Sequence, residues 1–188
     1  MIITLNGKPG SGKSSIAQAL ADELGYRRYY MGQVRRDLAK QHGLTLAELN
    51  AVGEKEDWTD RPVEAEVERL GRTEDNFIIE GRTAWHFIPQ SLKVFLDVSL
   101  SVGAQRIFKH LQTGSSDRNE AAGIASVQDV ERLNQERIQS DTLRYQKYYG
   151  LDVINPRNYD LWLDTTNLTQ AEVYQQVLSF VKKSISRR

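Results

Sequence analysis

Short apolar runs along the chain alternate with longer stretches in which apolar residues recur at helical spacing. Four runs rich in β-branched and aromatic residues predict buried strands over residues 2–6, 77–80, 92–98 and 159–164, and a weaker run predicts a fifth over 28–31. Strands separated by helices need crossover connections, which make a sheet mainly parallel and place helices on both of its faces. The pattern therefore predicts a three-layer α/β fold around a five-stranded sheet.

Three of the helical stretches begin with a Ser or Thr that is followed three residues later by an acid. In such a capping box, the hydroxyl and the carboxylate accept hydrogen bonds from amides that the first helical turn leaves unpaired. The sequence therefore predicts helix N-termini at three pairs: Thr45 with Glu48, Ser126 with Asp129, and Thr169 with Glu172.

A polar segment rich in Gly and Ser, over about residues 112–126, lies between two helical stretches and has no periodicity of its own. This composition is typical of a mobile loop inside a domain rather than of a linker between domains. We therefore expect one domain over residues 1–188 with this segment as a lid.

Composition and charge exclude several classes of protein. The 25 Lys and Arg residues balance the 25 Asp and Glu residues, so no overall positive field attracts nucleic acid or an anionic membrane. The chain has no cysteine, which excludes disulfides, thiolate metal sites and a cysteine nucleophile. Its apolar runs are too short to span a bilayer, and the first one reaches a glycine too early for a signal peptide. We expect a cytoplasmic monomer or weak homo-oligomer with no nucleic-acid or membrane partner.

The strongest motif follows the first predicted strand and opens a helix, and it matches G-x-x-x-x-G-K-[ST] in full. Its glycines let backbone amides turn toward phosphate oxygens, and the helix adds its positive end. Lys13 supplies a charge for the β- and γ-phosphates, and the Ser14 hydroxyl suits Mg²⁺. The sequence predicts a P-loop NTPase fold that binds ATP and Mg²⁺ through Gly7, Lys8, Pro9, Gly10, Ser11, Gly12, Lys13, Ser14 and Ser15.

Arginines at the ends of predicted elements indicate which P-loop class is present. Guanine-binding switches need an Asn-Lys-x-Asp motif, which the chain lacks, whereas a small kinase needs arginines to hold a second phosphate. Arg36 lies one turn after Gly32, at the start of a helix. Arg82 follows Glu80 at the carboxyl end of a strand, where α/β sheets bind ligands, and Glu80 could also steady the water shell of Mg²⁺.

A third group lies on the helix after the lid. Arg137, Asp141 and Arg144 have the spacing i, i+4, i+7, so they form one stripe in which the acid can orient either guanidinium. The stripe could equally be a salt-bridged exposed face, and Arg36 could be a solvated charge.

Six stretches occur in a fixed order from Met1 to about Thr166: GKPGSGKSS, MGQVRRDLAKQHGLTLAELN, NFIIEGRTAW, LKVFLDVSLSVGAQR, the R-x-x-S-D-x-x-R-Y of 137–145, and YDLWLDTT. Through them the chain resembles the cytidylate kinases, which are P-loop nucleoside monophosphate kinases, and is most similar to their short branch, common in archaea. In such kinases the P-loop holds the donor ATP.

The resemblance implies roles that spacing alone does not give. The arginines matched by Arg36, Arg82 and Arg137 grip the acceptor phosphate, and the family's base and ribose contacts fall on Asp141 and Arg144. The implied acceptor-binding set is therefore Gly32, Arg36, Arg82, Arg137, Asp141 and Arg144.

The resemblance also implies a catalytic set of Lys13, Arg106 and Arg137, in which Arg106 matches an arginine that faces the triphosphate, and an acceptor-binding arm over about residues 30–72. The chain departs from the family at Met31, where longer relatives carry Ser, and in a lid whose one arginine is Arg118.

The expected reaction moves the γ-phosphoryl group of ATP to CMP or dCMP first and UMP next, with the choice of base open. The alternatives are another small-acceptor kinase of the adenylate or shikimate type, or a nucleotide-binding regulatory module. Asp60 matches an acid of the family but lies in a generic charged stretch.

Overall fold

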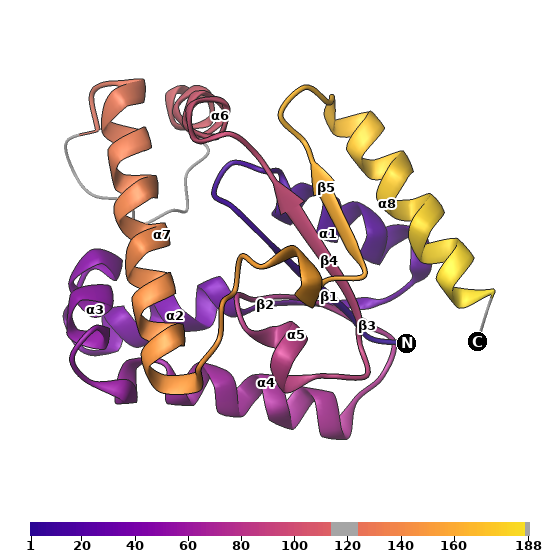
Figure 1. The fold of residues 1–188 in the computed structure, drawn as a ribbon, viewed down its shortest axis with the longest axis horizontal. Helices are drawn as coiled ribbons and strands as arrows, with labels where there is room; N and C mark the ends of the chain where they lie inside the picture. Colours follow the sequence, from indigo (N-terminus) through magenta and orange to yellow (C-terminus); the bar gives the residue numbers. More distant parts are fainter. Residues whose placement is uncertain (114–123, 187–188) are drawn as a thin grey trace.

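The computed structural model describes residues 1–113 and 124–186 (Figure 1). Most of the predicted lid, with Arg118, lies outside the described residues. The elements are β1 (Ile3–Gly7), α1 (Lys13–Leu24), β2 (Arg27–Tyr30), α2 (Met31–Gln41), α3 (Leu46–Gly53), η1 (Asp57–Thr59), α4 (Arg61–Thr73), β3 (Phe77–Glu80), α5 (Ala84–Phe87), β4 (Leu92–Asp97), α6 (Leu100–Gln112), α7 (Val127–Tyr149), η2 (Pro156–Asn158), β5 (Leu161–Asp164) and α8 (Gln170–Ile185).

The five strands form one parallel sheet in the order β2-β3-β1-β4-β5, which confirms the predicted fold class. In this register Leu5 of the central strand lies between Glu80 and Val94. The last strand begins two residues later than predicted, because the amide of Tyr159 closes a 3₁₀ turn onto the carbonyl of Pro156. Because all the pairings are parallel, the carboxyl ends of the five strands lie at the same edge of the sheet.

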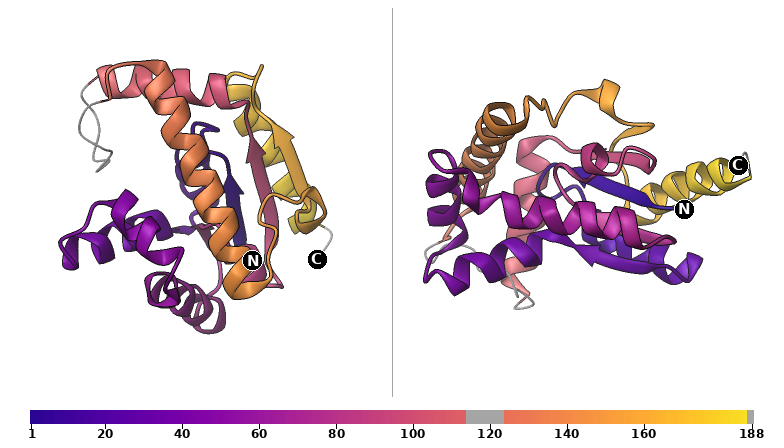
Figure 2. Two further views of the ribbon diagram at one scale, coloured as in Figure 1. Left: turned by 60° about the vertical axis from the view of Figure 1, so that its left-hand side comes forward. Right: turned by 90° about the horizontal axis from the view of Figure 1, so that it is seen from below.

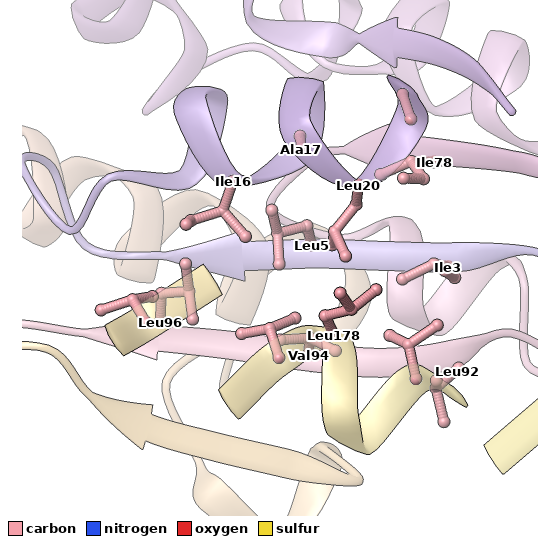
Figure 3. Packing of buried hydrophobic residues seen from close by; sticks show 14 residues of the cluster. Ile3, Leu5, Ile16, Ala17, Leu20, Ile78, Leu92, Val94, Leu96 and Leu178 are labelled. Carbon is pink, nitrogen blue, oxygen red and sulfur yellow. The ribbon is translucent and has the colours of Figure 1, made fainter. Parts of the chain in front are cut away.

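Helices cover both faces of the sheet, because successive strand residues point to opposite sides. On one face, α1 and α8 pack against β1 and β4, as Figure 3 shows for Ile16, Leu20 and Leu178 around Leu5 and Val94. On the other face, α4 and α5 cover a second core cluster, which comprises Ile2, Met31, Val63, Val67, Leu70, Phe77, Ile79, Ala84 and Ile88. The three predicted layers are thus present.

Side-chain caps mark the N-termini of three predicted helices. Thr45, Ser126 and Thr169 each accept a hydrogen bond from the amide three residues on, and the acid at that position bonds back to the cap amide. All three predicted capping boxes are confirmed. Among the helices of the described ranges, none is both long and apolar enough to cross a membrane.

The carboxyl edge of the sheet faces α2, α3 and α7. The left view of Figure 2 shows α3 standing out from the sheet. The long helix α7 packs against α6 near its start and against α3 further along (Figure 1). The segment predicted as the acceptor-binding arm, residues 30–72, thus forms α2, α3, η1 and most of α4.

Candidate functional site

A cavity of about 640 Å³ lies at the carboxyl edge of the sheet. Its wall is built from the P-loop, α2, α4, the turn after β3, α6 and α7, so segments far apart in the sequence meet there. Of the residues predicted outside the P-loop, it brings together Gly32, Arg36, Arg82, Arg106, Arg137 and Asp141. Gly7, Lys8 and Arg144 do not contribute to this wall.

The P-loop backbone is held by close approaches that only glycine permits. Gly7 has φ +151°, and a Cβ there would lie 2.1 Å from the carbonyl oxygen of Leu96. Gly10 has φ +79°, and a Cβ there would lie 2.3 Å from the carbonyl oxygen of Gly103. The loop therefore lies tightly between β4 and α6.

The N-terminus of α1 is prepared for an anion. Its cap residue is Gly12, with φ 88° and ψ 10°, and no side chain of the described chain caps it. The first-turn amides therefore point toward the cavity without a side-chain acceptor, which favours phosphate oxygens. Lys13 lies over the loop and donates to the carbonyl of Lys8 at 2.7 Å. Lys8 itself turns behind the loop and pairs with Asp97 at 2.7 Å.

Ser14 and Glu80 form an oxygen pair beside the P-loop. The Ser14 hydroxyl donates to a Glu80 carboxylate oxygen at 2.9 Å. Glu80 is buried, and Arg28 holds it through two hydrogen bonds of 2.8 and 2.5 Å. A hydroxyl and a carboxylate are the oxygen donors that Mg²⁺ prefers, so this pair fits the ion. The sequence analysis missed Arg28, although it lies on the strand that neighbours Glu80.

Three guanidinium groups from three elements share the cavity. Arg36 donates to the carbonyl of Gly32 at 2.8 Å and to the hydroxyl of Tyr30 at 2.9 Å. Arg82 donates to the carbonyl of Gly7 and to other partners described below. Within residues 1–113 and 124–186, no group accepts a hydrogen bond from Arg137, and burial, followed by the like charge on Arg82, lowers its pKa. This cluster favours an anion between its members.

Asp141 is the carboxylate that organises the cluster. It accepts from Arg82 Nε at 3.0 Å and from Arg144 Nη2 at 2.5 Å. Burial alone would raise the pKa of Asp141, but Arg82, Arg144 and Arg137 together lower it to about 2. Asp141 is therefore ionised at neutral pH and compensates only part of the positive charge around it.

Arg144 is fully buried behind Asp141. Burial opposes its charge, but Asp141 and other neighbours outweigh that effect and raise its pKa. It also donates to Asn50 at 3.0 Å and lies 3.3 Å from the Asp60 carboxylate. The predicted stripe is therefore not an exposed face. Arg144 does not line the cavity itself, but its partner Asp141 does.

The sequence analysis missed Arg35, which lines the same cavity and is also buried. Its guanidinium donates to Asp60 at 2.6 Å and to Asn50 at 3.1 Å. Asp60 is 1% exposed, so the carboxylate that the sequence left in a charged stretch is an internal counter-ion for Arg35 and Arg144. This network ties α2, α3 and α7 together.

Arg106 of α6 is fixed beside the P-loop. It donates to the carbonyl of Thr165 at 2.7 Å, to the Thr165 hydroxyl at 3.1 Å and to the carbonyl of Leu168 at 3.2 Å. The loop after β5 therefore positions this guanidinium on the side of the cavity where the P-loop lies.

Glu64 on α4 was also missed. It lines the cavity, is 5% exposed and accepts a hydrogen bond from the Thr83 hydroxyl at 2.5 Å. Burial raises its pKa to about 8. In the sequence, Glu64 resembles the other acids of its helix, and its position between Val63 and Val67 was the available signal.

The chain is similar in sequence to known proteins. The family model described as "Cytidylate kinase-like family" matches residues 2–167. A cytidylate kinase from Natronomonas pharaonis is 36% identical over 183 residues, covering 96% of this chain and 89% of the relative. One from Sulfurisphaera tokodaii is 30% identical over 189 residues, covering 100% and 98%.

Solved structures share the fold at low identity. A shikimate kinase from Bacteroides thetaiotaomicron has a TM-score of 0.62 at 16% identity, covering 99% of this chain and 98% of its own. A gluconokinase from Sinorhizobium meliloti has a TM-score of 0.61 at 20% identity, covering 98% and 93%. These similarities confirm the predicted P-loop kinase fold.

Proposed function

The chain belongs to the cytidylate kinase-like family, and from this membership we propose that it moves the γ-phosphoryl group of ATP to the phosphate of CMP or dCMP, and less readily of UMP. Membership of the family makes the protein a nucleoside monophosphate kinase, as the sequence predicted. The donor, the base and the metal are the parts of the proposal that need a test.

The observation that carries the proposal is the arginine cluster opposite the P-loop. Arg36, Arg82 and Arg137 come from α2, the turn after β3 and α7, and they line one cavity with the P-loop. A guanidinium binds a phosphate through paired donors, so the cluster suits the acceptor phosphate. The amides that begin α1, together with Lys13, suit the phosphates of ATP.

In the proposed reaction an oxygen of the acceptor phosphate bonds to the γ-phosphorus while the bond from that phosphorus to the β–γ bridging oxygen breaks. The acceptor oxygen is already anionic, so no general base is needed. The protein contributes position and charge neutralisation, through Lys13 and Arg106 on the donor side and Arg137 between the two substrates.

Ser14 and Glu80 are the residues that would hold Mg²⁺, Glu80 through its water shell. When bound there, the ion neutralises phosphate charge. Arg28 keeps the Glu80 carboxylate in place for this role.

A coupled ADP-release assay tests the proposal. Purified protein with ATP and Mg²⁺ is supplied separately with CMP, dCMP, UMP, AMP, GMP, dTMP and shikimate. We expect release that depends on a pyrimidine monophosphate, fastest with CMP or dCMP. A response to shikimate alone, or release that no monophosphate accelerates, would reject the proposal in favour of the alternatives.

A further inference from the structure

The same cavity has a part of its wall, called the slot below, that α2, α4 and α7 contribute. Apolar wall residues there include Met31, Val63, Val67 and Tyr145. A planar base fits a slot with apolar faces and a few polar groups at its end. The acceptor's base would extend into this slot if the arginines hold its phosphate, a step that rests on the proposed function.

Glu64 lies in the wall of this slot in a fixed orientation. The Thr83 hydroxyl donates to its Oε2 at 2.5 Å, while Oε1 accepts no hydrogen bond from the part of the chain that the structure describes. Thr83 directly follows Arg82, so one turn positions both the acid and a guanidinium of the cluster. The acid is therefore held by the residue next to a guanidinium of the cluster.

Asn50 and Asp60, which lie near Glu64 in sequence or in space, are already engaged by arginines. Asn50 accepts from both Arg35 and Arg144, and the Asp60 carboxylate lies against the same two arginines. Oε1 of Glu64, by contrast, is an acceptor that the contacts within residues 1–113 and 124–186 leave available.

We propose that Glu64, oriented by Thr83, reads the exocyclic group of the pyrimidine and sets the preference for cytosine over uracil. Cytosine carries an amino group at C4, which donates to a carboxylate oxygen. Uracil carries a carbonyl oxygen at the same position, which a carboxylate repels. A site built for one hydrogen-bonding partner rejects a ligand that leaves its buried group unpaired.

The charge state of Glu64 strengthens this discrimination as the pH rises. Burial raises its pKa to about 8, while Arg35 of α2 and Arg144 of α7 pull it down and Asp60, before α4, pushes it up. Tyr145 and Tyr149 of α7 also interact with it electrostatically. When neutral, the acid discriminates less, because a carboxylic acid offers an O–H donor as well as an acceptor. When ionised, it accepts only from cytosine.

Glu64→Gln is the decisive variant, because the Thr83 hydroxyl would bond to the amide oxygen and turn the amide NH₂ toward the base. At about pH 9, where Glu64 is ionised, we expect the ratio of kcat/KM for CMP to that for UMP to fall by about tenfold or more. Glu66→Gln makes the same change on the same helix, where the carboxylate pairs with Arg69 at 2.7 Å, and should leave the ratio unchanged.

A folding check by thermal melting accompanies both variants. If Glu64→Gln does not fold, Thr83→Val removes only the orienting hydroxyl and should lower the ratio by a smaller factor. In the wild-type protein, the ratio of CMP affinity to UMP affinity should rise between about pH 7 and pH 8.5.

The outcomes separate this inference from the proposed function. A folded Glu64→Gln protein with the wild-type preference would overturn the role of Glu64 while the kinase activity stands. A wild-type protein that phosphorylates no monophosphate would overturn the proposed function, and the inference with it.

Discussion

Replacing Asp141 by Asn tests the electrostatic core of the site most directly. The substitution keeps the size of the side chain and removes the negative charge shared by Arg82 and Arg144. In the folded protein the pKa of Asp141 falls from 3.8 to about 2. By linkage, that fall corresponds to about 2 kcal/mol of folding free energy at neutral pH. Leaving Arg144 buried without this partner adds to the loss, so we expect a destabilisation of about 2–4 kcal/mol.

Urea unfolding followed by tryptophan fluorescence measures this loss. The pKa of Asp141 is lower in the folded protein than in the unfolded chain, so its contribution is present above about pH 4 and lost as the pH falls through about 2. The stability gap between the wild type and Asp141→Asn should therefore narrow in acid. Asp37→Asn, at an exposed carboxylate that accepts from Gln33, is the matched control and should change stability by less than about 0.5 kcal/mol. A gap at pH 7 no larger than that of the control would refute the reasoning.

Three further predictions concern the substrates. Lys13→Ala should lower kcat about 100-fold or more in the ADP-release assay with an unchanged circular dichroism spectrum, and retention of wild-type kcat would contradict its role. Arg36→Ala should raise the KM for CMP by about tenfold or more with a smaller change in kcat, and a KM change confined to ATP would argue against an acceptor site there. Gly10→Ala places a Cβ 2.3 Å from the carbonyl oxygen of Gly103, so equilibrium titration should show weakened ATP binding, and unchanged affinity would mean that the loop tolerates the shift.

Local sequence patterns were sufficient to predict most secondary-structure elements and the fold class of this protein. Strand positions follow from short β-branched runs, and the helix starts at Thr45, Ser126 and Thr169 follow from a hydroxyl and an acid three residues apart. The P-loop could likewise be predicted from a local motif, because the backbone conformation of the loop requires the glycines of that motif. Such features depend on neighbours in the sequence.

Buried charges depend instead on neighbours in space. Arg35 and Arg36 are adjacent, yet one is bonded to Asp60 inside the protein and the other lines the cavity beside Tyr30. Glu64 is buried while the similar Glu66 pairs with Arg69 outside the slot. Helical spacing placed Arg144 on the correct stripe but did not predict its burial, which comes from the packing of α3 against α7 and from the ion pair with Asp60.

Helix α7 contacts elements at both ends of the cavity. It packs on α6, which carries Arg106, and further along it donates from Lys147 to the carbonyls of Glu54 and Lys55. Arg106 on one side of the cavity and the end of α3 on the other are therefore carried by elements that contact the same helix. Thermodynamic reciprocity then requires that the factor by which CMP changes the Kd of ATP equals the factor by which ATP changes the Kd of CMP.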